Sequence, residues 1–304
     1  MPKTKVNNVE IAWEIHGERS DPVIVLIQGL SMPLTATPPE MISQLVEAGY
    51  CVLTFDNRDA GQSQLLSEIK PANFAWQFVR KLLHLSVDMP YELDDMMRDT
   101  AALMTALDIE RAHVIGISMG GMIAQLLAIH HPERVLSLTS IMSTTGRRGL
   151  PGPERAVRNH IVKGPADTTP EARLEYQRAL WRLLGGPDYP LPNAELEAFL
   201  ERILKRGMTA QGAARQSLAI LGAYSRAPFL HQLSVPTLVI HGEDDPLVNI
   251  AGGYDTARCV PGARMVAIPG MGHDLPLALL ERINGAVLQH MSVAGSNGRT
   301  TRAA

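Results

Sequence analysis

The stretch that decides the fold lies near the middle of the chain, at residues 114–121, with the sequence VIGISMGG. Residues 113–117 are apolar and mostly β-branched, which is typical of a strand buried on both faces of a parallel sheet. Residues 119–130 are apolar at nearly every position, which predicts a helix packed against that sheet. Pro132 ends this helix, because proline lacks a backbone donor and restricts the residue before it.

Between this strand and this helix lies the pattern Gly-x-Ser-x-Gly, formed by Gly116, Ser118 and Gly120. A serine on so tight a turn has a strained backbone, and its neighbours two residues away approach each other closely. Side chains at both glycine positions would collide there, so the pattern needs residues without a Cβ. The serine hydroxyl then lies at a helix N-terminus, with the Met119 N–H directed at a developing oxyanion. This is the pattern of a nucleophile elbow.

Composition limits the class of protein. With 304 residues, 45% hydrophobic and 19% charged, the chain is typical of a globular α/β domain carrying an insertion. The net charge of −3 argues against nucleic acid or an acidic membrane surface as the main partner. No apolar run is long enough to cross a membrane and the polar start lacks a signal segment, so we expect no membrane partner and a cytoplasmic location.

Cysteine and histidine usage gives no sign of a metal site. Cys51 and Cys259 lie far apart in apolar surroundings, and we expect both to be buried free thiols. The ten histidines show no spacing typical of metal ligands. We therefore expect neither a metal nor a cofactor.

Strand and helix signals alternate through the first part of the chain. Residues 6–16 alternate apolar and polar side chains, as expected of antiparallel strands at a sheet edge. Continuous apolar runs at 23–27 and 50–55 predict buried parallel strands, and residues 39–48 and 91–107 predict helices. Residues 64–90 are less regular, and we interpret them as an insertion or mobile flap near the site.

The pattern changes after a further predicted strand at 134–142. Residues 143–225 show only helix signals, at 153–163, 170–184, 194–206 and 210–224. We interpret this block as a helical cap or lid that closes the site, in preference to a decoration far from it.

The strand pattern returns at 235–240 and 263–268, and residues 275–290 predict a closing helix. Residues 1–142 and 226–293 thus form one α/β core, and the polar residues 294–304 are expected to be a disordered tail. The predicted fold class is α/β, with a mostly parallel, doubly wound sheet and an inserted helical cap.

A serine is a weak nucleophile at neutral pH and needs a base that a third group orients. Such partners must follow strands, in the order serine, acid, histidine. Asp245 and His273 meet this requirement, since each lies just beyond the end of a predicted buried strand. Glu243 and Asp244 compete with Asp245 for the role of the acid, and Asp274 is a less suitable fourth because it adjoins the base.

Two further groups of residues allow more than one interpretation. Asp56 and Asp59 lie in the cluster DNRDAGQS at 56–63 and could form a catalytic pair, but such residues also suit a tight, hydrogen-bonded turn, which we favour. Several apolar residues near the motifs form either a hydrophobic acyl pocket or ordinary core, with neither favoured. They are Leu30, Met32, Met119, Met122 and Met271.

Four motifs, in this order, resemble those of the α/β-hydrolase superfamily. They are Asp-x-Arg-x-x-Gly-x-Ser at 56–63, Gly-x-Ser-x-Gly-Gly at 116–121, His-Gly-x-x-Asp at 241–245 and Gly-x-Gly-His at 270–273. The resemblance covers nearly the whole chain except its tail, and the chain is most similar to the aclacinomycin methylesterase-like branch of carboxylesterases. It implies an α/β-hydrolase fold and serine-dependent hydrolysis of a small hydrophobic ester through an acyl-enzyme. In that family the aspartate four residues after the motif histidine is the triad acid, which supports Asp245 beside Ser118 and His273.

One position departs from the family pattern. Many relatives carry His-Gly after the first buried strand, where this chain has Gln28 and Gly29. By position, the N–H of Leu30 is the second oxyanion donor, with that of Met119 as the first. Because both donors belong to the backbone, the missing histidine need not impair catalysis, but Gln28 is left without a role.

The same fold hosts many chemistries, so other functions stay open. Serine rather than aspartate at the elbow disfavours haloalkane dehalogenases and epoxide hydrolases. Among serine enzymes, the alternatives are a cofactor-free haloperoxidase or perhydrolase and a hydrolase of lactones or C–C bonds. From another class, a non-catalytic small-molecule receptor could retain the pocket, although the complete set of three residues argues against it.

Overall fold

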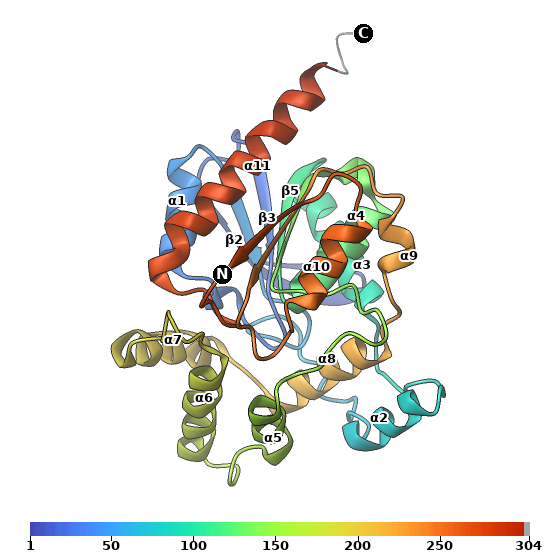
Figure 1. The fold of residues 1–304 in the computed structure, drawn as a ribbon, viewed down its shortest axis with the longest axis vertical. Coiled ribbons are helices and arrows are strands. Elements are labelled where there is room, and N and C mark those ends of the chain that lie inside the picture. Colours follow the sequence, from blue (N-terminus) through green and yellow to red (C-terminus); the bar gives the residue numbers. More distant parts are fainter. Residues whose placement is uncertain (301–304) are drawn as a thin grey trace.

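The computed structural model describes residues 1–300, with the side chains of residues 1–294. Within these residues, an eight-stranded sheet runs through the centre of the molecule, in the order β1-β2-β4-β3-β5-β6-β7-β8 (Figure 1). Strands β1 (Lys3–Val6) and β2 (Val9–His16) form an antiparallel edge, which confirms the sequence-based expectation. The other strands are parallel: β3 (Val23–Ile27), β4 (Cys51–Phe55), β5 (Ala112–Ile117), β6 (Val135–Ile141), β7 (Thr237–Gly242) and β8 (Arg264–Ile268).

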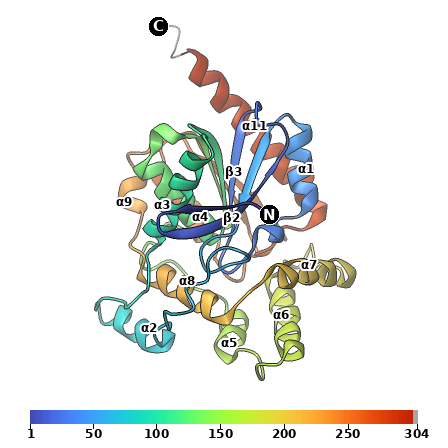
Figure 2. The same ribbon diagram turned by 180° about the vertical axis from the view of Figure 1, so that it is seen from behind.

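Helices cover both faces of this sheet (Figures 1 and 2). Helices α1 (Pro39–Glu47) and α11 (Leu280–Thr300) pack together on one face. The other face carries α3 (Leu93–Ala106), α4 (Met119–His130), α9 (Ala227–Leu230) and α10 (Ala251–Cys259). Successive strand residues point to opposite faces, so Val25 packs with α3 and α4 whereas Ile24 and Leu26 pack with α1 and α11. The mostly parallel, doubly wound sheet is therefore confirmed.

Helix α10 has no counterpart among the predicted helices. It carries Gly252 and Gly253, and glycine lowers helix propensity by about 1 kcal/mol relative to alanine. Both glycines permit close packing, because a Cβ on Gly252 would press against Thr144 and one on Gly253 against the His241 ring. Tertiary packing therefore stabilises a helix that the local sequence does not indicate.

The closing helix begins and ends later than its predicted range of 275–290. Residues Leu277–Leu279 form a 3-10 turn, and α11 then continues to Thr300. The helix thus includes much of the segment 294–304 that we expected to be a disordered tail. The last four residues of that segment, 301–304, lie outside the described residues.

Helices without strands fill the described chain between β6 and β7. Before the short α9, they are α5 (Arg155–Lys163), α6 (Pro170–Leu184), α7 (Asn193–Arg206) and α8 (Ala210–Gly222). Both views place them together at one end of the molecule (Figures 1 and 2). A further helix from the predicted flap, α2 (Phe74–Leu82), packs against α8 at the same end.

Candidate active site

Strand β5 brings Ser118 to a sharp turn at the start of α4. The backbone of Ser118 has φ +54° and ψ −117°, a conformation that side-chain-bearing residues rarely adopt. A Cβ on Gly116 would collide with the carbonyl of Gly120, and a Cβ on Gly120 with the carbonyl of Ile27. These close approaches confirm the steric reason for both glycines. The Ser118 N–H donates to the Ile141 carbonyl of β6 at 2.9 Å, which ties the turn to the neighbouring strand.

The loop after β8 brings His273 to this serine. The Nε2 atom of His273 lies 3.0 Å from the Ser118 Oγ, and its Nδ1 lies 2.7 Å from the Oδ2 of Asp245 in the loop after β7. Because β5, β6, β7 and β8 are parallel, their carboxyl ends meet at one edge of the sheet. The structure therefore brings together three side chains that are 155 and 28 residues apart in sequence.

Additional contacts fix the Asp245 carboxylate. Its Oδ1 accepts hydrogen bonds from the N–H groups of Leu247 at 2.9 Å and Val248 at 2.8 Å. The His241 ring donates from Nε2 to the Val248 carbonyl and lies 3.3 Å from the Asp245 Oδ2. Burial alone would raise the pKa of Asp245, but His273 and His241 outweigh it and hold the pKa well below its usual range. A charged Asp245 favours the His273 tautomer that donates from Nδ1 and accepts at Nε2.

The competing carboxyl groups have other surroundings. Glu243 is exposed, and the Asp244 Oδ2 accepts a hydrogen bond from the Gly270 N–H at 2.9 Å. Asp274 is buried, and neither of its carboxyl oxygens has a hydrogen-bond partner among the described residues. Burial raises the pKa of Asp274 to about 7, with His273 opposing this rise. Within the described chain, Asp245 is the acid that lies within hydrogen-bonding distance of the His273 ring.

The loop after β3 lies against the nucleophile. A Cβ on Gly29 would be 3.3 Å from the Cβ of Ser118. The next residue, Leu30, has an N–H that donates to no other described residue. Met119 occupies the first position of α4, where a backbone N–H has no partner within the helix. The N–H groups of Leu30 and Met119, which are predicted to form the oxyanion hole, therefore lie beside Ser118 without a backbone partner.

Polar side chains hold this loop in place from both sides. Gln28, for which the sequence suggested no role, donates from Nε2 to the Thr37 Oγ1 at 2.7 Å. Its main-chain carbonyl accepts from the Asn57 side chain at 3.1 Å. Ser31 has a φ of +61°, and its N–H donates to the Gln216 Oε1 of α8 at 2.6 Å. Gln216 belongs to the helical block and was not identified from the sequence, because no local motif marks a contact over 185 residues.

The turn cluster at 56–63 binds two arginines of the helical block. The Asp56 carboxylate accepts from the Nε of Arg206, at the end of α7, at 2.9 and 3.0 Å. The Asp59 carboxylate accepts from the Nε and Nη2 of Arg215, on α8, at 2.8 and 2.6 Å. All four side chains are buried. These contacts support the interpretation of this cluster as a hydrogen-bonded turn over that of a catalytic carboxylate pair.

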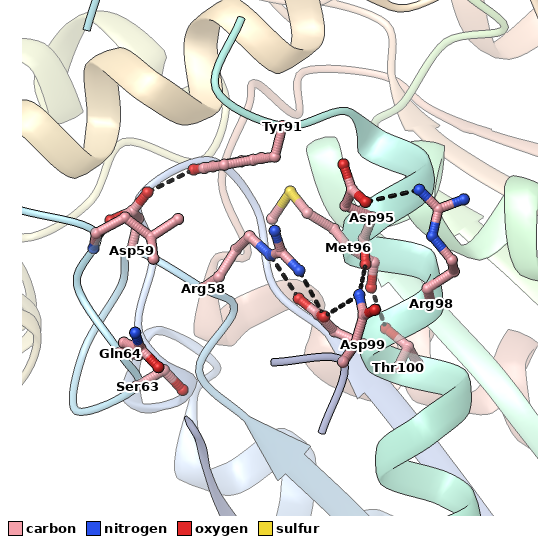
Figure 3. A network of polar contacts seen from close by, with 12 residues as sticks. Arg58, Asp59, Ser63, Gln64, Tyr91, Asp95, Met96, Arg98, Asp99 and Thr100 are labelled. Atoms are coloured by element: carbon pink, nitrogen blue, oxygen red, sulfur yellow. Dashed lines mark hydrogen bonds and ion pairs between the residues drawn. The ribbon is translucent and has the colours of Figure 1, made fainter. Parts of the chain in front are cut away.

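The network extends from this turn into α3 (Figure 3). The Tyr91 hydroxyl donates to the Asp59 Oδ2 at 2.8 Å. Arg58 binds the Asp99 carboxylate through Nε at 2.6 Å and Nη2 at 2.7 Å. The Asn7 side chain donates to the same carboxylate. The turn therefore joins the amino-terminal edge, α3 and the helical block in one polar network that is mostly buried.

A cavity of about 470 Å³ opens over Ser118 and His273, between the strand ends and the helical block. Its lining is mostly apolar and includes Trp181 of α6 and Phe199 of α7. From the sequence, five apolar residues near the motifs could either line an acyl pocket or belong to the core, and the structure shows some in each place. Leu30 and Met32 line the cavity, whereas Met119, Met122 and Met271 are buried in the core.

The described residues contain neither a cluster of metal ligands nor a helix that could span a membrane. No set of three or more His, Cys, Asp or Glu side chains there could hold a metal ion. No helix in that part of the chain is long and apolar enough to cross a membrane. Cys51 and Cys259 are buried and free, as predicted.

Comparisons with known proteins agree with this architecture. A family model described as the alpha/beta hydrolase fold matches residues 22–277. The chain belongs to this family. Among its relatives, rhodomycin D methylesterase DnrP of Streptomyces peucetius is 30% identical over 97% of this chain and 99% of that protein. The non-heme haloperoxidase of Rhodococcus erythropolis is 25% identical, over 80% and 83% of the two chains.

Solved structures give the same result. The enol-lactonase from Burkholderia xenovorans LB400 superposes on this α/β-hydrolase with a TM-score of 0.71, covering 96% of this chain and 100% of that one at 25% identity. The family match and the methylesterase relatives confirm the resemblance drawn from the motifs. The α/β-hydrolase is a carboxylic ester hydrolase related to methylesterases.

Proposed function

We propose that Ser118, His273 and Asp245 are the catalytic triad that hydrolyses carboxylic esters in this protein. The observation that carries the proposal is the unbroken line of two hydrogen bonds, 3.0 and 2.7 Å long, that joins the three side chains beside the cavity. A hydroxyl, an imidazole and a carboxylate in this order are the parts that serine hydrolases use.

The chemistry of each step follows from these contacts. The Ser118 Oγ attacks the ester carbonyl while the His273 Nε2 accepts its proton, and Asp245 stabilises the imidazolium that forms. The tetrahedral oxyanion binds the N–H groups of Leu30 and Met119. His273 then gives its proton to the leaving alkoxide, which departs as the alcohol and leaves an acyl-enzyme. A water molecule, deprotonated by the same imidazole, hydrolyses the acyl-enzyme and releases the acid.

The substrate that we propose is a small hydrophobic ester, a methyl or other short-alkyl ester of a hydrophobic acid. A mostly apolar cavity of about 470 Å³ suits such a molecule, because binding it removes apolar surface from water. The choice of a short alcohol follows the relatives named as methylesterases. In this proposal residues 143–225 act as a cap over the cavity, residues 1–142 and 226–293 supply the core, and the enzyme acts in the cytoplasm without nucleic acid as a partner.

The names of two relatives suggest alternative activities. One is named a haloperoxidase and another an enol-lactonase, so perhydrolysis or ring opening by the same triad is a second candidate. A panel of p-nitrophenyl esters of increasing chain length, assayed with and without hydrogen peroxide and beside a set of lactones, separates these activities. We expect the short esters to be hydrolysed fastest, without stimulation by peroxide. Faster turnover of lactones, or activity that depends on peroxide, would favour the second candidate.

Covalent labelling tests the nucleophile directly. A fluorophosphonate should modify the protein stoichiometrically, and peptide mass spectrometry should find the modification on Ser118. His273→Ala should slow the labelling, because the base no longer accepts the serine proton. A label on another residue would contradict the proposed triad, and absence of labelling would favour a non-catalytic receptor.

A further inference from the structure

Helix α2 exposes apolar side chains on its outer side. Seven large apolar residues between positions 74 and 85 are exposed to solvent, and the exposed fraction reaches 63% at Leu82. We call this set the α2 apolar patch. It consists of Phe74, Trp76, Phe78, Val79, Leu82, Leu83 and Leu85. Isolated apolar residues on a surface are common, but a contiguous group of this kind marks an interaction site.

Hydrogen bonds from polar side chains of α2 hold the helix in this orientation. Gln77 is buried, and its Oε1 accepts from the Asp88 N–H at 2.8 Å. Lys81 donates from Nζ to the Ala223 carbonyl, next to α8, at 3.1 Å. Arg80 donates from Nε to the Ser86 carbonyl at 2.9 Å. These hydrogen bonds therefore fix the orientation in which α2 exposes its apolar side chains.

The charges at this end of the molecule are mainly positive. Helix α2 and the segment after it, residues 74–88, together with residues 154–163 around α5, contain five Lys or Arg residues and two acids, a net charge of 5 − 2 = +3. None of these five cations forms an ion pair within the described chain. The pKa of the Lys81 ammonium is lowered, first by burial and then by the nearby positive charge of Arg148.

Helix α5 also exposes apolar side chains at this end of the molecule. It exposes Ile161 and Val162, the latter with 81% of its surface in contact with solvent, beside the exposed Arg158 and Lys163. Helices α2 and α5 lie at the same end of the molecule in both views (Figures 1 and 2). Two helices with exposed apolar residues and unpaired cations thus share one end.

We propose that this end of the molecule, the α2 apolar patch with the exposed part of α5, binds the surface of an anionic lipid bilayer. Amphipathic helices that combine Trp, Phe and Leu with Lys and Arg lie at the boundary between lipid headgroups and acyl chains. Each Lys or Arg near an anionic surface adds about 1 kcal/mol of attraction. The net charge of −3 led us to expect no such partner, but it describes the whole chain, whereas binding depends on the charge of the surface that makes contact.

A second copy of the chain is a less suitable partner. In a two-fold symmetric contact each patch meets its own equivalent, so the unpaired cations beside one patch would approach those of the other. An anionic surface compensates these charges instead, and its apolar interior accepts the aromatic and leucine side chains without a shaped groove.

Flotation with lipid vesicles tests this proposal on the full-length protein. Vesicles of phosphatidylcholine with one third phosphatidylglycerol should bind the protein, pure phosphatidylcholine should bind it at least about tenfold more weakly, and high salt should weaken binding to the mixed vesicles. The Trp76→Ser/Phe78→Ser/Leu82→Ser variant should lose at least about tenfold in vesicle affinity, since each residue contributes apolar area. Its hydrolysis of a water-soluble ester should be unchanged.

Matched variants separate this surface from general hydrophobicity and from catalysis. Phe229→Ser/Tyr254→Ser removes comparably exposed aromatic residues on α9 and α10 and should bind vesicles like the unmodified protein. Ser118→Ala should also bind normally, so the surface does not depend on the proposed triad. Brominated lipids should quench the emission of Trp76, and this quenching should disappear in Trp76→Phe while binding persists.

Three results would overturn the proposal. The first is a triple variant that binds mixed vesicles as the unmodified protein does. The second is equal binding to neutral and anionic vesicles, or to neither. The third is a concentration-dependent dimer in solution that the triple variant abolishes, which would make the patch an interface between two copies.

Discussion

The two walls of the cavity are built by different kinds of contact. Ser118, Asp245 and His273 lie on loops that follow parallel strands, and the sheet itself brings these loops together. The opposite wall consists of helices α5–α8, which Arg206, Arg215 and other buried polar side chains fasten to the core. The comparison teaches that the sheet positions the reacting groups, whereas buried polar contacts position the wall that faces them.

The largest effect on activity is expected at the wall formed by the loops that follow the strands. Ser118→Ala should lower kcat by on the order of 10⁴–10⁶, because no other group supplies the nucleophile. The melting temperature should change little, since the alanine keeps the backbone of the turn and the His273 Nε2, which loses its partner, borders the cavity. Ester hydrolysis and thermal unfolding by circular dichroism measure the two quantities. A well-folded variant that keeps its activity would exclude Ser118 from the proposed role.

Substitutions in the helical wall, formed by α5–α8, should lower the free energy of unfolding rather than the catalytic rate. Arg215→Met leaves the buried Asp59 carboxylate without its cation and should cost about 3–5 kcal/mol in the free energy of unfolding. Asp59→Asn/Arg215→Met removes the uncompensated charge while keeping an oxygen for the Tyr91 hydroxyl, so it should be more stable than the single variant. Urea unfolding measures both. A cost below about 1 kcal/mol for Arg215→Met would show that this pair does not fasten α8.

The difference between the walls also explains what the sequence could predict. Ser118, Asp245 and His273 each belong to a short motif after an apolar run, and those local signals named all three residues that the structure brings together. The helices of the other wall were predicted nearly to the residue for α6 and α7, but their contacts were not. Arg206 and Asp56 are 150 residues apart, and nothing near either residue in sequence indicates its partner.

Asp274 lies where the two walls of the cavity meet. A Cβ on Gly185, at the end of α6, would be 3.7 Å from the Asp274 Oδ2. Its pKa of about 7 in the folded protein lies above the ordinary value of about 3.9 for an unfolded chain. The folded state therefore holds this proton more tightly, and the stabilisation is lost as the pH rises from about 4 to 7. Asp274→Asn should gain stability relative to the unmodified protein, by on the order of 2 kcal/mol more near pH 8 than near pH 5. Equal gains in urea unfolding at both pH values would contradict a raised pKa.

The smallest effect is expected at the contact between the helical wall and the loop that carries the proposed oxyanion donor Leu30. Gln216 holds the Ser31 N–H at 2.6 Å, and Ser31 follows Leu30, a proposed oxyanion donor. Gln216→Leu should lower kcat about tenfold with little change in KM, because a displaced donor weakens binding of the transition state more than that of the substrate. Gln216→Glu keeps the acceptor for Ser31 but loses the donor to the Arg58 carbonyl, so its kcat should be intermediate. Rates divided by the concentration of fluorophosphonate-reactive sites separate positioning from unfolding, since a purely structural residue would change the number of active sites and leave the rate at each site as it was.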